Sequence, residues 1–171
     1  WVSPFTTSVI SNPAYMGTDE VVAGTYLRES GFNWSGLYIA DGLQRTFDPF
    51  CNMWRRDAVY NSIRYCNTFL EKVWGVYNMT DAEKKLWVAE IKALKAYYYF
   101  ELLRHYGPFV VMDENIDPGV PVEDMKKERS PVDVCVEEIV SLLDEAMKDL
   151  PLMKDKERSR WAYHSLESAA A

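Results

Sequence analysis

The segment from Thr80 to Pro108 carries a long helical pattern with a clear start and a clear end. Residues 80–83 form a capping box, in which Thr80 and Glu83 each satisfy a backbone amide of the other residue. Gly107-Pro108 is a typical end signal, because glycine tolerates the conformation that terminates a helix and proline cannot continue it. Apolar residues recur at helical spacing along it: Trp87, Ile91, Leu94, Tyr98 and Leu102. A chain with such a central element is expected to build its core from helices.

A run of four aromatic residues lies inside this pattern: Tyr97, Tyr98, Tyr99 and Phe100. Consecutive residues of a helix point in different directions, so other elements must contact this helix on most of its sides. We therefore interpret the run as packing, and the helix as a buried member of a larger bundle.

A similar pattern precedes this helix. Asp48-Pro49 supplies an N-cap and a first-turn proline, and Gly75 and Asn78 end the helix. The apolar face is expected to consist of Val59, Ile63, Cys66, Leu70 and Val73. Because the connection to the helix that begins after Thr80 is short, the two should pair antiparallel.

Two more helices are expected after it. Ser130-Pro131 should cap a helix that Pro151 ends, with an apolar face of Val132, Cys135, Ile139, Leu142, Ala146 and Leu150. Another begins at Ser159 and contains Trp161, Ala162, Leu166 and Ala170. The prediction is an all-α fold of tetratricopeptide-like antiparallel helix pairs with long irregular loops.

Residues 1–50 differ from the helical part, residues 51–171. Five of the eight glycines and nine aromatic residues lie in this first segment, which predicts a long aromatic loop. Trp34 and Tyr38 can stack on the C–H faces of a sugar. Polar partners for its hydroxyl groups would be Asn33, Asp41, Gln44 and Arg45. The alternative, that the rings only pin the loop onto the helices, remains open at this point.

Other kinds of site find less support. The charge sum of 19 basic and 26 acidic residues, −7, argues against a nucleic-acid partner. Cys51, Cys66 and Cys135 have no metal-binding spacing and are expected to be small buried apolar residues. His105, with a second histidine at 164, offers no zinc site; it should act at a helix C-terminus. No metal or cofactor is expected.

Two sets of charged residues allow both a functional and a purely structural interpretation. Paired carboxylates could catalyse glycoside hydrolysis, and candidates are Asp113, Glu114 and Asp117, with Glu123 and Asp124 beyond them. Adjacent carboxylates in a polar loop are, however, usually solvated. Arg55, Arg56 and Arg64 could bind anions or form ordinary surface pairs. No nucleophile elbow or glycine-rich phosphate loop is present.

Four blocks resemble the SusD/RagB family of nutrient-binding outer-membrane lipoproteins. Residues 60–71 (YNSIRYCNTFLE) are similar to the family's Y-x-x-I-R-x-x-N-x-F-L helix, with Trp54 before them. Residues 90–102 (EIKALKAYYYFEL) and 106–110 (YGPFV) resemble its tyrosine-rich signature. Residues 129–151 and 158–162 are similar to two later motifs. Lys95 and Glu157 stand where arginine and glycine are usual, and Val111 departs from a usual proline-leucine pair.

The resemblance implies a protein without catalytic activity that binds a glycan, or in some members a peptide. It would hand this ligand to a SusC-type TonB-dependent transporter at the cell surface. Family members are lipoproteins of the outer membrane, so the lipid anchor is expected upstream of Trp1. They are also much longer, so residues 1–171 would be a single truncated N-terminal domain. A helical-repeat scaffold for protein partners and, less favoured, an α-helical glycoside hydrolase are the alternatives.

Overall fold

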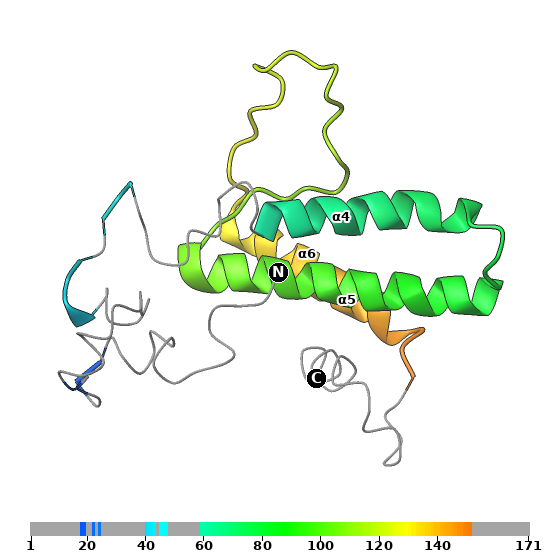
Figure 1. Ribbon diagram of the computed structural model, residues 1–171, viewed down its shortest axis with the longest axis horizontal. Helices are drawn as coiled ribbons and strands as arrows, with labels where there is room; N and C mark the ends of the chain where they lie inside the picture. The colour runs from blue at the N-terminus through cyan, green and yellow to red at the C-terminus, as the bar shows by residue number, and fades with distance from the viewer. Residues whose placement is uncertain are drawn as a thin grey trace. The chain divides into compact units, whose positions relative to one another are not determined.

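The computed structural model describes residues 18, 19, 22, 24, 40–43, 45–47 and 59–151 (Figure 1). The chain divides into two compact units, residues 1–58 and 59–171. The described residues of the first unit carry no long element. Those of the second form α4 (Val59–Lys72), the short 3₁₀ helix η2 (Val73–Gly75), α5 (Asp81–Tyr106) and α6 (Val132–Met147). Every regular element described is helical, which confirms the predicted all-α class. The segment around Asp48-Pro49 and the helix predicted from Ser159 lie outside the described residues.

The three long helices run alternately in opposite directions (Figure 1). Five residues connect η2 to α5, so α4 and α5 form the antiparallel pair that the short connection predicts. Helix α6 packs on α5 at a cluster of small residues, Ala89, Ala93 and Ala146, with Leu143 and Leu150 at its border. An ion pair between Lys92 and Glu145 also joins these two helices. Small side chains let the two backbones approach each other closely.

The ends of α5 are those that the sequence predicts. The Thr80 hydroxyl accepts a hydrogen bond from the Glu83 amide at 3.3 Å, and the Glu83 carboxylate accepts one from the Thr80 amide at 2.8 Å. At the other end, Gly107 has a φ of 69° and donates its amide to the Leu103 carbonyl at 2.9 Å. A positive φ favours glycine, which explains the residue at this position.

The predicted apolar face of α5 is only partly correct. Tyr98 and Leu102 are buried, but Ile91 and Leu94 are half-buried and Trp87 is 39% exposed. The prediction assumed one buried face, whereas α5 packs against α4 and α6 together and uses its alanines for close contact. Of the aromatic run, Tyr98 and Tyr99 are buried, Tyr97 is half-buried and Phe100 is exposed.

The faces of α4 and α6 follow their predictions more closely. Val59, Ile63, Cys66 and Val73 are buried from α4 and η2, with Leu70 half-buried. From α6 the buried residues are Cys135, Ile139, Leu142 and Ala146. Val132, predicted to be buried, is 48% exposed at the first position of α6.

The cap predicted for α6 is wrong in its detail. Pro131 is the N-cap residue, and no side chain of the described part of the chain caps the helix. The Ser130 amide instead donates to the Phe109 carbonyl at 2.9 Å, and this bond connects the start of α6 to the chain that follows α5. The thiols of Cys66 and Cys135 are free and buried, as predicted for small apolar residues; Cys51 lies outside the described residues.

Candidate functional site

Two of the six predicted ligand-binding residues lie within the described part of the first unit. Asp41 and Arg45 are both exposed, and the Arg45 guanidinium lies over the Phe47 ring at 5.7 Å. The other four, Asn33, Trp34, Tyr38 and Gln44, lie outside the described residues. The grouping of the six into one site therefore stays a prediction.

The extended segment 109–112 crosses the second unit and has no partner strand within residues 59–151. Helix side chains satisfy its backbone groups instead. The Tyr60 hydroxyl accepts from the Val110 amide at 2.9 Å and donates to the Val110 carbonyl at 3.1 Å. The Tyr99 hydroxyl makes the same two bonds with Met112, also at 2.9 and 3.1 Å. The two hydroxyls thus replace the neighbouring strand that such a segment usually requires.

Burial keeps both phenols neutral. It raises the pKa of Tyr60 to about 12, although the hydrogen bond with Val110 acts in the opposite direction. It raises the pKa of Tyr99 further, with the Met112 hydrogen bond again opposing. A neutral phenol both donates and accepts, whereas a phenolate only accepts, so the paired bonds depend on this protonation state.

Phe109 anchors the start of the same segment. It is fully buried, and its ring stacks on the Tyr99 ring with centroids 4.7 Å apart and an interplanar angle of 10°. The Phe109 carbonyl receives the Ser130 amide and lies 3.6 Å from the Cys135 sulfur. The segment is therefore fixed to α4, α5 and α6 at once.

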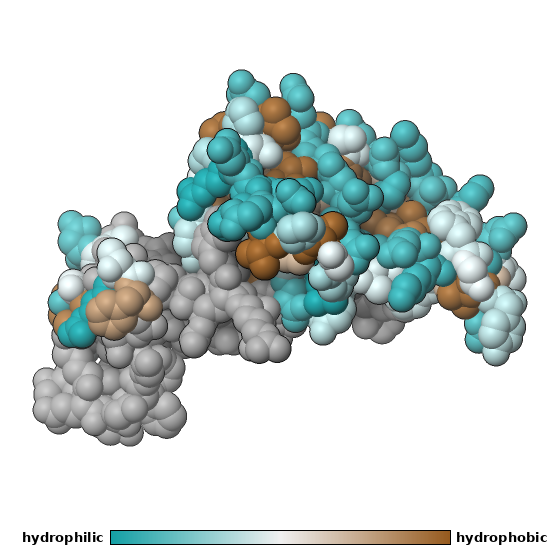
Figure 2. All heavy atoms as spheres, turned by 90° about the horizontal axis from the view of Figure 1, so that it is seen from above, coloured by the Kyte–Doolittle hydropathy of each residue, from teal (hydrophilic) through white to brown (hydrophobic). Residues whose placement is uncertain are grey.

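The loop from residue 113 to residue 129 leaves this segment and rises beyond α4 (Figure 1). Asn115 ties it down, because its Nδ2 donates to the Thr68 hydroxyl at 2.9 Å and to the Arg64 carbonyl at 3.3 Å. Seen from the side of this loop, hydrophobic residues show in several places between hydrophilic ones (Figure 2). The loop ends at Ser130, where the chain returns to Phe109.

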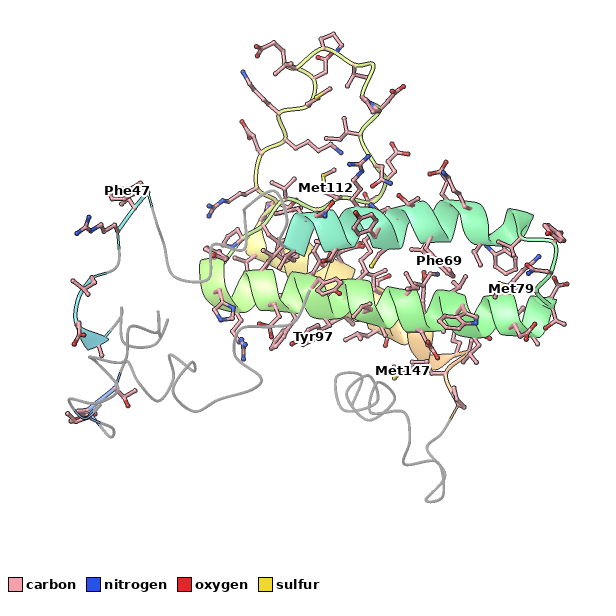
Figure 3. The ribbon with its side chains drawn as sticks, viewed as in Figure 1. Phe47, Phe69, Met79, Tyr97, Met112 and Met147 are labelled. Atoms are coloured by element: carbon pink, nitrogen blue, oxygen red, sulfur yellow. The ribbon has the colours of Figure 1, made fainter. Side chains whose placement is uncertain are left out.

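A hollow of about 400 Å³ lies between α4 and this loop. Residues of α4 line one side, including Tyr60, Arg64 and Asn67, and Met112 and residues of the loop line the other. Figure 3 labels Met112 near α4 at the base of the loop. Asn67 is 5% exposed; its Nδ2 donates to the Met112 carbonyl at 2.9 Å, and its Oδ1 has no hydrogen-bond partner among the described residues. The sequence did not predict this hollow, although Arg64 was considered for anion binding.

The acidic loop residues considered for hydrolysis are open to water. Asp113, Glu114, Asp117, Glu123 and Asp124 are all exposed, and Asp117 accepts the Gly119 amide at 2.8 Å in a local turn. General acid catalysis by a carboxyl group usually relies on a site that shields it from water. Among the described residues, no group of three or more metal-ligating side chains occurs.

Buried charges at α5 are a further feature that the sequence did not predict. Lys95 is 3% exposed, and burial lowers its pKa, while Glu138 and Asp113 counteract that shift. Burial also raises the pKa of Glu138. Glu101 is 2% exposed and accepts from Arg104 at 2.9 Å. His105 lies in the last turn of α5, as predicted, with Nδ1 2.8 Å from the Glu101 carbonyl oxygen.

None of the helices within the described residues is both long and apolar enough to cross a membrane. A comparison with curated proteins finds no match. Among solved structures, a protein named BT4246 is 34% identical, with 66% of this chain and 19% of that chain aligned at a TM-score of 0.56. A SusD-like protein of Bacteroides fragilis NCTC 9343 (BF3747) is 24% identical, with 85% and 27% aligned at 0.64.

A laminarin-binding SusD-like protein is 20% identical, with 82% of this chain and 29% of that chain aligned at a TM-score of 0.64. The chain thus spans less than a third of the length of these structures. The likeness confirms the predicted fold of tetratricopeptide-like helix pairs. A family model described as starch-binding and associating with the outer membrane matches residues 15–171, and the chain belongs to this SusD-like family.

Proposed function

We propose that this protein binds a glycan at the outer-membrane surface without transforming it and passes it to a SusC-type TonB-dependent transporter. The observation that carries the proposal is the family match over residues 15–171, whose description names starch binding and the outer membrane. The name of one structural neighbour includes laminarin binding, and that of another, from Bacteroides uniformis, surface glycan binding. A lipid anchor upstream of Trp1 would hold the protein at the membrane.

The proposed glycan site consists of the aromatic and polar residues of the first unit. Trp34 and Tyr38 would stack on sugar rings, while Asn33 and Gln44 would bind hydroxyl groups through their amides. Asp41 and Arg45 would supply charged hydrogen bonds, and both are exposed, as a surface site requires. None of these residues is assigned a catalytic role, and the exposure of the loop carboxylates supports binding over hydrolysis.

Calorimetry with starch and laminarin oligosaccharides tests the glycan site. One stacked ring contributes about 0.5–1.5 kcal/mol, so Trp34→Ala should weaken binding about 2- to 10-fold. Trp74→Ala is the matched control, because Trp74 is an exposed tryptophan of η2. Equal affinity of the two variants would reject the site. If the unaltered protein bound neither class of oligosaccharide, the proposal of glycan binding would be rejected.

A protein partner is supported by apolar side chains on the outer face of α6. Val132, Val136 and Val140 follow one another at four-residue spacing and are 42–48% exposed. Such a stripe suits contact with another protein surface. Co-purification of the transporter with the protein tests the delivery step. A protein partner without saturable glycan binding would favour the helical-repeat scaffold, and turnover of a polysaccharide would favour the hydrolase.

A further inference from the structure

The hollow between α4 and the loop of residues 113–129 has a chemistry different from that of the proposed glycan site. Its walls are largely aliphatic, formed by Ile63, Met112, Ile116, Pro118 and Met125. The one aromatic residue among the described lining residues, Tyr60, has its hydroxyl engaged with Val110. Sugar rings carry hydroxyl groups around their edge and need polar partners there, whereas aliphatic walls suit an apolar group. Methionine walls also adapt to groups of different shape.

Asn67 adds an acceptor whose hydrogen-bonding capacity is unused. The residue is 95% buried, and its amino group is fixed on the Met112 carbonyl at 2.9 Å. Its Oδ1 is closed to solvent and has no partner among the described residues. A buried acceptor without a donor is costly. A ligand N–H that reaches Asn67 Oδ1 from the hollow would give this oxygen the hydrogen bond that it lacks.

Arg64 adds a positive charge beside these two features. Of the described residues that line the hollow, Arg64 is the one with a charged side chain. It is exposed, and it takes part in none of the ion pairs among the described residues. A guanidinium group matches a carboxylate in two parallel hydrogen bonds. The loop carboxylates Asp113, Glu114 and Asp117 are exposed and do not line the hollow.

We propose that this hollow binds the carboxyl-terminal residue of a peptide that ends in an apolar side chain. The side chain lies between the aliphatic walls, the N–H of the same residue donates to Asn67 Oδ1, and the terminal carboxylate pairs with Arg64. This site belongs to the second unit and shares no residue with the proposed glycan site. The two proposals therefore stand or fall separately.

The methionines of the chain allow a direct test. Met112 and Met125 line the hollow, whereas Met79 lies in the turn before α5 and Met147 ends α6 (Figure 3). In the full chain labelled with ¹³C at the methionine methyl groups, N-acetyl-L-leucine should shift the Met112 and Met125 signals saturably. The signals of Met79 and Met147 should stay unchanged. Absence of a saturable shift at Met112 and Met125 with millimolar N-acetyl-L-leucine would overturn the proposal.

Matched ligands separate the three contacts without altering the protein. N-acetyl-L-leucinamide lacks the carboxylate, and the O-acetyl ester of the corresponding hydroxy acid lacks the N–H. Each should bind at least fivefold more weakly than N-acetyl-L-leucine. An acetylated pentapeptide of four alanines and a carboxyl-terminal leucine should bind at least as tightly as N-acetyl-L-leucine. Its failure to bind would overturn the peptide assignment, and shifts of Met112 and Met125 by maltohexaose would reassign the hollow to glycan.

A pair of charge variants tests the carboxylate contact. Arg64→Gln should reduce the affinity for N-acetyl-L-leucine to that of the amide and leave the amide affinity unchanged. Lys148→Gln is the matched control, because Lys148 is an exposed cation at the end of α6. Equal affinities for acid and amide in the unaltered chain, with no effect of Arg64→Gln, would overturn the proposal.

Discussion

Tyr99 and Met112 exchange two hydrogen bonds, in which one hydroxyl group accepts the amide at 2.9 Å and donates to the carbonyl of the same residue at 3.1 Å. Tyr60 binds Val110 in the same way. Val110 and Met112 are separated by one position of an extended chain, so their backbone groups lie on the same side. Two helices thereby hold, through their side chains, a segment that has no strand beside it among the described residues.

Replacing Tyr99 by phenylalanine tests the strength of this arrangement. Tyr99→Phe keeps the stacked ring but leaves the Met112 amide without its partner, while the Met112 carbonyl still receives Asn67. A buried donor without a partner costs about 1–3 kcal/mol, so the free energy of unfolding should fall by about that amount in urea titrations. Tyr77→Phe is the control, because Tyr77 is 96% exposed and should change stability by less than about 0.5 kcal/mol. Equal stability of the two variants would show that the bonds contribute nothing.

The raised pKa of Tyr60 predicts a loss of stability in alkali. The folded protein holds this phenol neutral up to a pKa of about 12, whereas the unfolded chain ionises it near the ordinary pKa of 10.0. The unfolded state therefore loses its proton first as the pH rises. The contribution of this phenol is complete below pH 10 and is lost between about pH 10 and 12.

The comparison of the wild type with Tyr60→Phe isolates this effect, because the other titrating groups are common to both. The stability difference between them, measured by urea unfolding at about pH 8 and about pH 11, should shrink at the higher pH. In a spectroscopic titration of the folded wild type, the number of tyrosines that ionise near pH 10 should be smaller than the number in the chain, because Tyr60 ionises only near pH 12. A constant difference between the two pH values would contradict the neutral, bonded state of Tyr60.

The close contact of α5 with α6 depends on alanine. Ala93 is fully buried in the cluster with Ala89 and Ala146, so Ala93→Leu forces extra atoms between the two helices. Overpacking of this kind costs about 1–3 kcal/mol, which thermal or urea unfolding should detect. The control is Ala82→Leu, an exposed position in the first turn of α5. If the Ala93→Leu variant were as stable as the wild type, the helices would separate there at little cost.

Local signals predicted the helices well because their causes are local. The capping box at Thr80 and the glycine at 107 act within a few residues, and both work as the sequence predicts. The buried face of α5 was predicted less well, since it depends on two neighbouring helices that the spacing of apolar residues cannot reveal. Lys95 and Glu101 are examples of residues that a pattern of apolar positions misses, because both have ionisable side chains and are nevertheless buried, at 3% and 2% exposure.

The partners of the extended segment were beyond prediction for a different reason. Tyr60 lies 50 residues before Val110, and no local pattern connects them. One signal was present: a short apolar stretch without a second strand needs partners for its amides, and tyrosine hydroxyls on flanking helices can supply them. The same long-range packing creates the hollow at Asn67. The candidate glycan residues could be named only by type, and two of the six, Asp41 and Arg45, are described.

Two glycines of the second unit should respond to alanine with opposite signs. Gly107 combines a φ of 69° with a ψ of −141° in open space, a conformation that is essentially restricted to glycine. Gly107→Ala therefore carries backbone strain alone and should destabilise the protein by about 1–3 kcal/mol. Gly75 is the last residue of η2, and its φ lies outside the positive range that favours glycine. Nothing lies within 4 Å of a Cβ added at this position. Gly75→Ala should therefore stabilise the protein by about 0.4–1 kcal/mol, because alanine restricts the unfolded chain. Urea unfolding of the two variants beside the wild type measures both effects. A loss of stability at Gly75 equal to that at Gly107 would mean that the end of α5 requires nothing special of its glycine.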